Sequence, residues 1–333
     1  MSTKGRLWVF GLRGIDHEGG VETHVREVYT RLAQRGWDVT IWQKRPYVKG
    51  NDAFYTATLK HLRCVRGKYL ETPTYVVSSI LRCVMEVKQL PLPLVIFHSV
   101  GFAYTPFFLR LLGYVVIQVY HSANHLHEKW GKIARWFLRR CEHAAVTSAA
   151  HVVCVAKRQR LYLYNKYGIG ATYIPNGVSK PHVISLDKGF KYALTVGRLT
   201  PEKRILELVK QWVSLPEMPH KLVVVGELTN TPYCKELKRW AHYNDSVKLI
   251  GNVKASDMAG WYSNASLFIL PGLSEGMPIA LLEALSYGLP CFVHDEKIKE
   301  EMPMTRDELF TTYSWDTIAE QYEEVFNACY TKR

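Results

Sequence analysis

The sequence predicts two α/β domains, each built on a parallel sheet that helices cover on both faces. The chain has 333 residues, enough for two domains with separate hydrophobic cores. In both halves, short apolar runs of strand length alternate with segments of helical periodicity. This alternation indicates parallel sheets, because a parallel connection needs a long crossover, usually a helix.

The first half opens with a β-α-β unit. Leu7–Phe10 is a short apolar run, and we interpret it as a strand rather than a signal peptide because no cleavage pattern follows. Apolar residues at helical spacing follow over 21–32, and Gly36 stands where a helix C-cap belongs. The next strands are expected at Val39–Trp42, Val95–Phe97, Val115–Tyr120 and Val152–Val155.

The second half repeats the pattern. Residues 205–212 have the spacing of a helix, and Pro278–Tyr287 is a helix with proline at its start. Strands are expected at Ala193–Val196, Leu222–Val225, Val247–Ile250 and Leu267–Leu270. The stretch Val178–Gly189 has no clear periodicity, so it is interpreted as the linker. The predicted domains are 1–180, onto which a C-terminal helix at 315–330 packs, and 188–314.

Composition excludes several classes of protein. The longest apolar segment, Tyr75–Phe97, contains Arg82, Glu86 and Lys88, so it is not expected to span a bilayer. The seven cysteines include no C-x-x-C pair, which argues against a zinc site and a disulfide framework.

Charge is distributed unevenly along the chain. Residues 1–180 carry 26 Lys and Arg against 10 Asp and Glu, whereas residues 181–333 carry 17 against 20. A basic half indicates a polyanionic partner, either nucleic acid or an anionic membrane. The sequence contains no nucleic-acid recognition motif, so nucleic acid is not expected as a partner.

Three segments that follow predicted strands could hold a ligand, because doubly wound sheets bind ligands at the carboxyl ends of their strands. The first, GLRGIDHEGGVE at 11–22, places Gly19 and Gly20 at a helix N-terminus, where amides can approach a phosphate. Its spacing is not that of the dinucleotide fingerprint, and alone it is equally typical of an ordinary glycine loop.

The second segment, VGRLTPEK at 196–203, opens the predicted helix at 205–212. Arg198 offers a forked guanidinium and Lys203 a point charge, and together they could clamp a diphosphate. The alternative is two solvated charges beside a helix start.

The third segment is SEGMPIALLEALSYG at 274–288. Glu275 precedes the predicted helix and Glu283 lies within it among leucines and alanines, where a carboxylate usually needs a partner. Carboxylates accept hydrogen bonds from sugar hydroxyls, and the amides of Gly276 and Met277 lie at the helix start, where anions bind. Pro278, the next residue, is expected to lie at the same donor site.

With these residues in view, the chain resembles retaining GT-B glycosyltransferases of family 4. The third segment resembles their E-x7-E signature, the second their donor-phosphate site, and IPNGV at 174–178 the end of their N-terminal domain. Three other stretches resemble a branch that includes many assigned rhamnosyltransferases, namely RGI…GGVET…RLAQRGWDVTIW, HEKWGKIARWFLRRCEHAA and YSNASLFILPGLSEGMPIALLEA. The resemblance implies two Rossmann-like domains that face each other across a cleft, the N-terminal one on the acceptor side and the C-terminal one holding the nucleotide sugar.

The resemblance also implies roles for these residues. Glu275 would contact hydroxyls of the donor sugar, and Glu283 the ribose of the nucleotide. Arg198 and Lys203 would stabilise the leaving diphosphate, and the loop glycines Gly19 and Gly20 would face the same phosphates. His121, after the strand 115–120, matches a family histidine near the transferred sugar. His98 is a weaker candidate, and a lone histidine after a strand is more often structural.

The implied activity is transfer of a hexose from a nucleotide diphosphate sugar to a glycan or lipid-linked acceptor, in cell-surface polysaccharide or lipopolysaccharide synthesis. No cofactor or metal is expected, since the chain contains no Asp-x-Asp. Residues 43–95 match the family poorly, which leaves the acceptor open. A GT-B sugar-nucleotide epimerase and a non-catalytic sugar-nucleotide-binding protein remain alternatives, although Glu275 and His121 argue against the latter.

The segment Glu128–His143 is expected to be a helix that attaches the protein to an anionic membrane, on the cytoplasmic face of the inner membrane. Cations recur at spacings of three and four, and aromatic residues flank them. The cations are Lys129, Lys132, Arg135, Arg139 and Arg140, and the apolar residues are Trp130, Ile133, Trp136 and Phe137. The alternative is that the apolar residues pack into the domain core.

Overall fold

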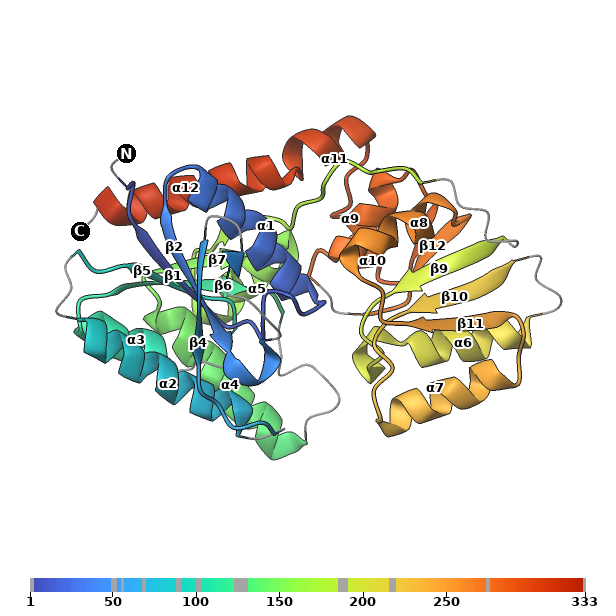
Figure 1. Ribbon diagram of the computed structural model, residues 1–333, viewed down its shortest axis with the longest axis horizontal. Coiled ribbons are helices and arrows are strands. Elements are labelled where there is room, and N and C mark those ends of the chain that lie inside the picture. The colour runs from blue at the N-terminus through green and yellow to red at the C-terminus, as the bar shows by residue number, and fades with distance from the viewer. Residues whose placement is uncertain are drawn as a thin grey trace. The chain divides into compact units, whose positions relative to one another are not determined.

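The computed structural model describes residues 3–48, 53–54, 57–67, 70–87, 91–99, 104–122, 131–184, 191–215, 220–273 and 276–331. The chain divides into two compact units. Unit 1 consists of Met1–Asn176 and Trp315–Arg333, and unit 2 consists of Gly177–Ser314 (Figure 1).

Unit 1 contains an eight-stranded sheet in the order β3-β4-β2-β1-β5-β6-β7-β8, parallel except for the β3–β4 pair. The strands are β1 (Arg6–Phe10), β2 (Asp38–Lys44), β3 (Ala53–Phe54), β4 (Ala57–Leu62), β5 (Leu94–Phe97), β6 (Val115–Tyr120), β7 (His151–Cys154) and β8 (Thr172–Tyr173).

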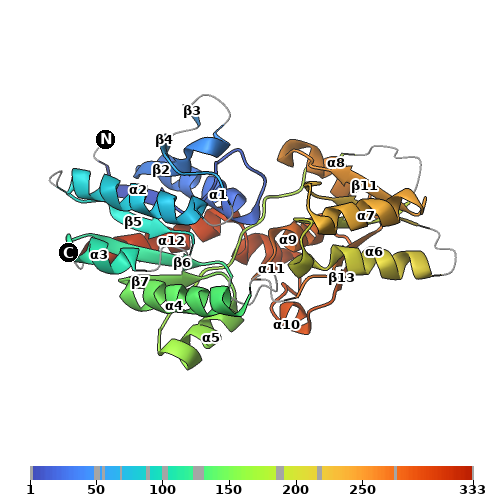
Figure 2. The same cartoon turned by 90° about the horizontal axis from the view of Figure 1, so that it is seen from below.

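Helices lie on both faces of this sheet. Figures 1 and 2 show α1 (Gly20–Gln34) and α12 (Trp315–Thr331) on one face, and α2 (Glu71–Glu86), α3 (Thr105–Leu111) and α4 (Lys132–Ser148) on the other. Between β7 and β8 runs α5 (Lys157–Tyr167), which ends at Gly168 in the left-handed conformation that favours glycine.

The C-terminal helix α12 belongs to unit 1 because it packs on α1. The ring of Phe326 lies 6.4 Å from that of Tyr29 and 5.9 Å from that of Trp37. At the rim, Arg31 pairs with Asp316 at 2.9 Å, and Glu323 accepts from the indole of Trp37 at 3.0 Å. An apolar seam bordered by ion pairs therefore holds the end of the chain to its beginning.

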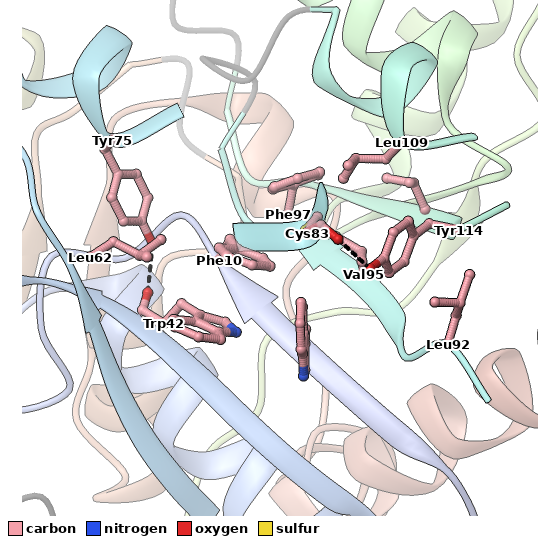
Figure 3. Close-up of a cluster of buried hydrophobic side chains, with 12 residues drawn as sticks. Phe10, Trp42, Leu62, Tyr75, Cys83, Leu92, Val95, Phe97, Leu109 and Tyr114 are labelled. Carbon is pink, nitrogen blue, oxygen red and sulfur yellow. Dashed lines mark hydrogen bonds between the residues drawn. The ribbon is translucent and has the colours of Figure 1, made fainter. Parts of the chain in front are cut away.

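The core on the opposite face is rich in aromatic side chains (Figure 3). Trp8 and Phe10 point to this face from β1, and the Phe10 ring stacks on Trp42 at 5.9 Å. Hydroxyl groups in this core satisfy backbone oxygens, as Tyr75 donates to the carbonyl of Trp42 and Tyr114 to that of Cys83. These bonds fix α2 against β2 and β6 and satisfy both tyrosine hydroxyls, whereas the buried indole nitrogen of Trp42 has no hydrogen-bond partner among the described residues.

Unit 2 contains a five-stranded parallel sheet in the order β11-β10-β9-β12-β13. The strands are β9 (Tyr192–Val196), β10 (Lys221–Val225), β11 (Val247–Gly251), β12 (Leu267–Leu270) and β13 (Cys291–Val293). The helices are α6 (Ile205–Ser214), α7 (Pro232–His242), α8 (Met258–Ser263), α9 (Ile279–Ser286), α10 (Glu296–Lys299) and α11 (Arg306–Thr312).

Both sheets have a point at which the strand order reverses. In unit 1 the chain runs outward from β1 to β2 on one side and to β5 on the other, and in unit 2 the reversal lies between β9 and β12. The crevice at the carboxyl end of such a reversal is where doubly wound sheets bind ligands.

The predicted fold class, two parallel-sheet α/β domains, is confirmed, and each predicted strand lies within two residues of an observed one. The unit boundary after Asn176 differs from the predicted end at 180. Val178 is buried and bridges to Ser314, so the expected linker begins inside unit 2. The strands β3, β4, β8 and β13 were not predicted, and neither were several helices, α2 among them. No helix in the described part of the chain is long and apolar enough to cross a bilayer.

Candidate active site

The loop between β1 and α1 is held in place by its neighbours. Gly11 has φ +106°, and a side chain there would press on the backbone nitrogen of His98 at 2.9 Å. The amide of Ile15 donates to the side chain of Gln43 at 2.7 Å, and the carbonyl of Arg13 accepts from the amide of Lys44 at 2.9 Å. The loop therefore has a defined shape at the carboxyl end of β1.

Gly19 and Gly20 lie at the start of α1, as the sequence suggested. Gly19 is the N-cap, and a side chain there would overlap the carboxylate of Glu22, which folds back to accept from the amide of Arg13. Gly20 has open space where a side chain would be. The first amides of a helix have no acceptor within the helix, so this turn can present N–H groups to an anion.

Three histidines gather at this end of unit 1. His98 follows β5, His121 follows β6, and His24 lies in the second turn of α1. The ring of His24 is 5.4 Å from that of His98 and 5.1 Å from that of His121. His24 and His98 are buried, and His121 is partly exposed. From the sequence, His121 and, more weakly, His98 were predicted to be site residues, whereas His24 was not predicted.

A chain of hydrogen bonds joins two of these histidines to Tyr29. The Tyr29 hydroxyl lies 2.8 Å from His98 Nε2, and His98 Nδ1 lies 2.9 Å from His121 Nε2. Within the described residues the buried Tyr29 hydroxyl bonds only to His98, so it donates there and leaves its proton satisfied. His98 then donates from Nδ1 to His121 Nε2, which puts the proton of neutral His121 on Nδ1.

His24 has a separate pair of partners. Its Nδ1 lies 2.9 Å from the carbonyl oxygen of the Asn176 side chain, and its Nε2 lies 3.1 Å from the Tyr322 hydroxyl. It therefore donates to Asn176 and accepts from Tyr322, and it joins α1 both to the last residue of the N-terminal segment and to α12.

Burial keeps the three rings neutral. It lowers the pKa of His24 to about 4, although the bond to Asn176 opposes the shift. Burial, with repulsion from the other two histidines, also lowers the pKa of His98, and burial with repulsion from His24 lowers the pKa of His121. Among the described residues, no group of three His, Cys, Asp or Glu side chains is arranged to hold a metal ion.

In unit 2 the loop after β9 carries the predicted cations. Arg198 is largely exposed, with its guanidinium 3.8 Å from Glu202, and Lys203 is partly exposed at the end of a short 3-10 turn, Pro201–Lys203. A side chain at Gly226, directly after β10, would overlap the carbonyl oxygen of Gly197. The glycine thus lets the β9 loop lie close over the end of β10.

Arg204 adds a third cation that the sequence did not indicate. Its backbone has φ +53°, the only positive value for a non-glycine residue in the described part of the chain. This conformation is costly for a residue with a Cβ, and it turns the chain from the 3-10 helix into α6. The guanidinium of Arg204 lies 3.1 Å from His294 Nε2, at the carboxyl end of β13.

The segment after β12 contains the remaining predicted residues. Ser274 and Glu275 lie outside the described residues. Pro278 is the N-cap of α9, and the side chain of Met277 is buried beside Val178 and Leu282, so Met277 can offer a ligand only its backbone. Gly276, which directly precedes Met277, is partly exposed.

Glu283 has the partner that its apolar surroundings required. Its Oε2 accepts from the buried hydroxyl of Tyr262 at 2.7 Å, and Tyr262 stacks on Tyr287 at 5.5 Å. The Glu283 carboxylate raises the pKa of Tyr262 further above its usual value, beyond the effect of burial, so the tyrosine stays a donor. The bond from Tyr262 therefore fixes the orientation of the Glu283 carboxylate.

Two family models match the sequence of this chain. The model described as Glycosyltransferase Family 4 matches residues 18–180, and that of Glycosyl transferases group 1 matches residues 180–328. Together the matches span both units and include the predicted residues. The chain belongs to glycosyltransferase family 4.

Relatives of this glycosyltransferase are distant. An uncharacterized glycosyltransferase of Haemophilus influenzae is 23% identical over 84% of this chain and 78% of its own length. An Escherichia coli enzyme named UDP-Gal:alpha-D-GlcNAc-diphosphoundecaprenol alpha-1,3-galactosyltransferase is 33% identical over 37% of this chain, and the match spans only a third of that enzyme's length. Sucrose-phosphate synthase from Thermosynechococcus elongatus superposes with a TM-score of 0.81 at 16% identity, over 99% of this chain and all of the other, which shows the shared GT-B fold.

Proposed function

We propose that this glycosyltransferase is a retaining, metal-independent enzyme that transfers a hexose from a nucleotide diphosphate sugar to a glycan or lipid-linked acceptor. The observation that carries the proposal is the arrangement at the carboxyl edge of the unit 2 sheet. Arg198 and Lys203 follow β9, and the loop leading to α9 and Glu283 follows the adjacent strand β12. Cations for a diphosphate and a carboxylate for sugar hydroxyls thus come from neighbouring strands.

In this proposal Glu283 holds the ribose, with Tyr262 orienting its carboxylate. Glu275 contacts hydroxyls of the transferred sugar. Arg198 and Lys203 bind the diphosphate and stabilise the charge that develops on it as the glycosidic bond breaks. The amides near Gly276 and Met277, and those near Gly19 and Gly20, donate to the same anion or to the sugar.

His121 supplies a neutral donor in this proposal. With its proton on Nδ1, it can donate a hydrogen bond to a hydroxyl of the transferred sugar, and its lowered pKa keeps it from adding a positive charge. Tyr29 and His98 are then positioning residues, which set the tautomer of His121 without touching the substrate.

The acceptor is proposed to be part of a cell-surface polysaccharide or lipopolysaccharide, presented at the cytoplasmic face of the inner membrane. The name of the Escherichia coli relative, whose acceptor is a diphosphoundecaprenol-linked sugar, supports a lipid-linked acceptor. A nucleotide diphosphate rhamnose is one of the donors to be tested.

The proposal is tested by incubating the full chain with a panel of uridine, guanosine and thymidine diphosphate sugars and a diphosphoundecaprenol-linked sugar. Product formation, with the anomeric configuration of the donor preserved in the nuclear magnetic resonance spectrum, is expected, and EDTA should leave the rate unchanged. An inverted product would refute the retaining mechanism. Loss of activity in EDTA that magnesium or manganese restores would refute metal independence.

Two variants separate the nucleotide site from the sugar site. Glu283→Ala should weaken titrated nucleoside diphosphate binding, whereas Glu275→Ala should bind the nucleotide normally and lose transfer. Nucleotide binding by Glu283→Ala that matches wild type would refute the ribose assignment. Release of a free epimer without acceptor would favour the epimerase alternative, and nucleotide-sugar binding without any turnover would favour a binding protein.

A further inference from the structure

Helix α2 has two apolar stripes, and only one of them faces the core. The buried stripe contains Tyr75, Ser79 and Cys83. The exposed stripe lies on the opposite side of the helix, at spacings of four, seven and eight residues, and contains Val77, Leu81, Val84 and Met85. Met85 is 70% exposed. A helix with water on its outer side normally has polar residues there.

The next two helices continue this apolar surface. The outward side of α3 presents Phe107, Phe108 and Leu111, which is 72% exposed, and Tyr104 precedes the helix. In α4 the rings of Trp136 and Phe137 are exposed to 59% and 60%. The sequence left open whether these two residues pack into the core, and they do not. Lys129 and Trp130 lie outside the described residues, as does the side chain of Ile133.

The three helices lie side by side on one face of the unit 1 sheet, with α3 between α2 and α4 (Figure 2). The helices on the other face differ: within the described residues, none of the exposed large apolar side chains belongs to α1 or α12. We name the exposed side chains of α2, α3 and α4, with Tyr104, the outer apolar surface. Ordinary monomers rarely expose a continuous apolar area of this kind without an interaction partner.

The charges of α3, of α4 and of the segments around them are almost all positive, whereas in α2 Arg82 pairs with Glu86, and Glu71 pairs with Lys44 of β2. Residues 87–180 contain twelve Lys and Arg but only two Asp and Glu, and one of the two acids, Glu142, is buried against the hydroxyls of three tyrosines. The exposed cations near the aromatic rings are Arg110, Lys132, Arg135, Arg139 and Arg140. A second copy of the chain would bring the same cations face to face, which is unfavourable.

We propose that the outer apolar surface inserts into the interfacial layer of an anionic lipid bilayer. Apolar and aromatic side chains that project between cations are what an interfacial segment needs, since the rings enter the acyl boundary while the cations remain at the head groups. The proposal goes beyond glycosyl transfer, and it extends the predicted contact from the single helix at 128–143 to three helices.

If the outer apolar surface inserts into the bilayer, membrane binding should depend on salt concentration differently from binding by charge alone. The Debye length falls to about 3 Å at about 1 M salt, so purely electrostatic attachment would be released. Burial of apolar side chains is not screened, so a bound fraction should persist in high salt once insertion has occurred.

The test is co-sedimentation of the full chain with vesicles of equimolar phosphatidylglycerol and phosphatidylcholine, and with phosphatidylcholine alone. The triple variant Phe107→Ser, Phe108→Ser, Trp136→Ser should lower the partition coefficient for anionic vesicles by at least about tenfold and abolish the salt-resistant fraction. The double variant Lys132→Gln, Arg139→Gln should lower binding in low salt by roughly tenfold. Wild type should bind neutral vesicles weakly.

The matched control removes exposed apolar side chains from unit 2. The double variant Leu215→Ser, Tyr243→Ser should bind vesicles as wild type does. Equal binding by the triple variant and wild type would overturn the proposal, as would a dimer in lipid-free sedimentation velocity that the triple variant abolishes. The assay needs no donor or acceptor, so its outcome is independent of the proposed reaction.

Discussion

The candidate residues of the two units differ in how they are held. Those of unit 1 are mostly buried, neutral and bonded to one another, as in the contacts of His24, His98 and His121 with Tyr29, Asn176 and Tyr322. Those of unit 2 are charged and more exposed, with Arg198 more than half exposed. A buried network has its geometry before any ligand arrives, whereas exposed cations become ordered when an anion binds them.

This difference has a physical cause. A neutral imidazole can be buried when both nitrogens have partners, but an arginine or lysine that must meet a diphosphate cannot be buried without one. Substitutions in unit 1 should therefore affect stability and positioning together, while substitutions in unit 2 should affect activity with little change in stability.

The largest expected effect is a loss of unit 1 stability at low pH. Because the folded pKa values of His24 and His98 lie below 6.5, unfolded chains bind protons that folded chains do not. Stability is complete above about pH 6.5 and falls toward pH 4 by about 1.4 kcal/mol per pH unit for each histidine. Urea unfolding between about pH 7 and 5 measures the slope. His24→Gln removes one of the protons that only the unfolded chain binds, so the slope of the unfolding free energy against pH should decrease. An unchanged slope would contradict the burial argument.

The second effect is on turnover. Arg198→Ala and Lys203→Ala should each lower turnover by about 10²-fold, the usual cost of removing one group that stabilises developing charge. Their free energies of unfolding should stay within about 0.5 kcal/mol of wild type. Lys238→Ala, an exposed cation on the outer side of α7, is the control and should be fully active. Normal turnover in both site variants would remove the diphosphate role.

A smaller effect tests whether the unit 1 network positions His121. Tyr29→Phe removes the hydroxyl that donates to His98 Nε2, so both tautomers of the His98–His121 pair become accessible. Turnover should fall by about tenfold and the pH–rate profile should shift, while nucleotide affinity is kept. A variant that loses stability but keeps the wild-type profile would show that Tyr29 is only structural.

The smallest expected effect is a gain in stability in unit 2. Arg204→Gly relieves the positive φ and should raise the free energy of unfolding by about 0.5–1 kcal/mol. Arg204→Ala keeps the Cβ and should change it little, which makes it the matched control. Equal stabilisation by both variants would place the cost in the guanidinium rather than in the backbone.

Much of the fold could be predicted because apolar periodicity is a local signal. Four of the five strands of unit 2, β9 to β12, and the helix α9 were predicted to within two residues, since continuous apolar runs are typical of parallel strands buried on both faces. The region of β3, β4 and α2 was not predicted. The strand β4 has mixed burial, and α2 has apolar residues on both sides, so neither gives a single clear periodicity.

Local sequence signals were sufficient to predict the α/β alternation, Gly19 at a helix start, Arg198 and Lys203 after a strand, Glu283 within a helix, and the positive charge of the first half. Which histidines meet depends on the packing of distant segments, because Tyr29, His98 and His121 come from separate elements that the β1–β5–β6 pairing brings together. The tertiary structure also decides which stripe of α2 is covered. The periodicity of the sequence shows that α2 has two apolar stripes. Which stripe is buried depends on the side of the sheet on which the chain crosses.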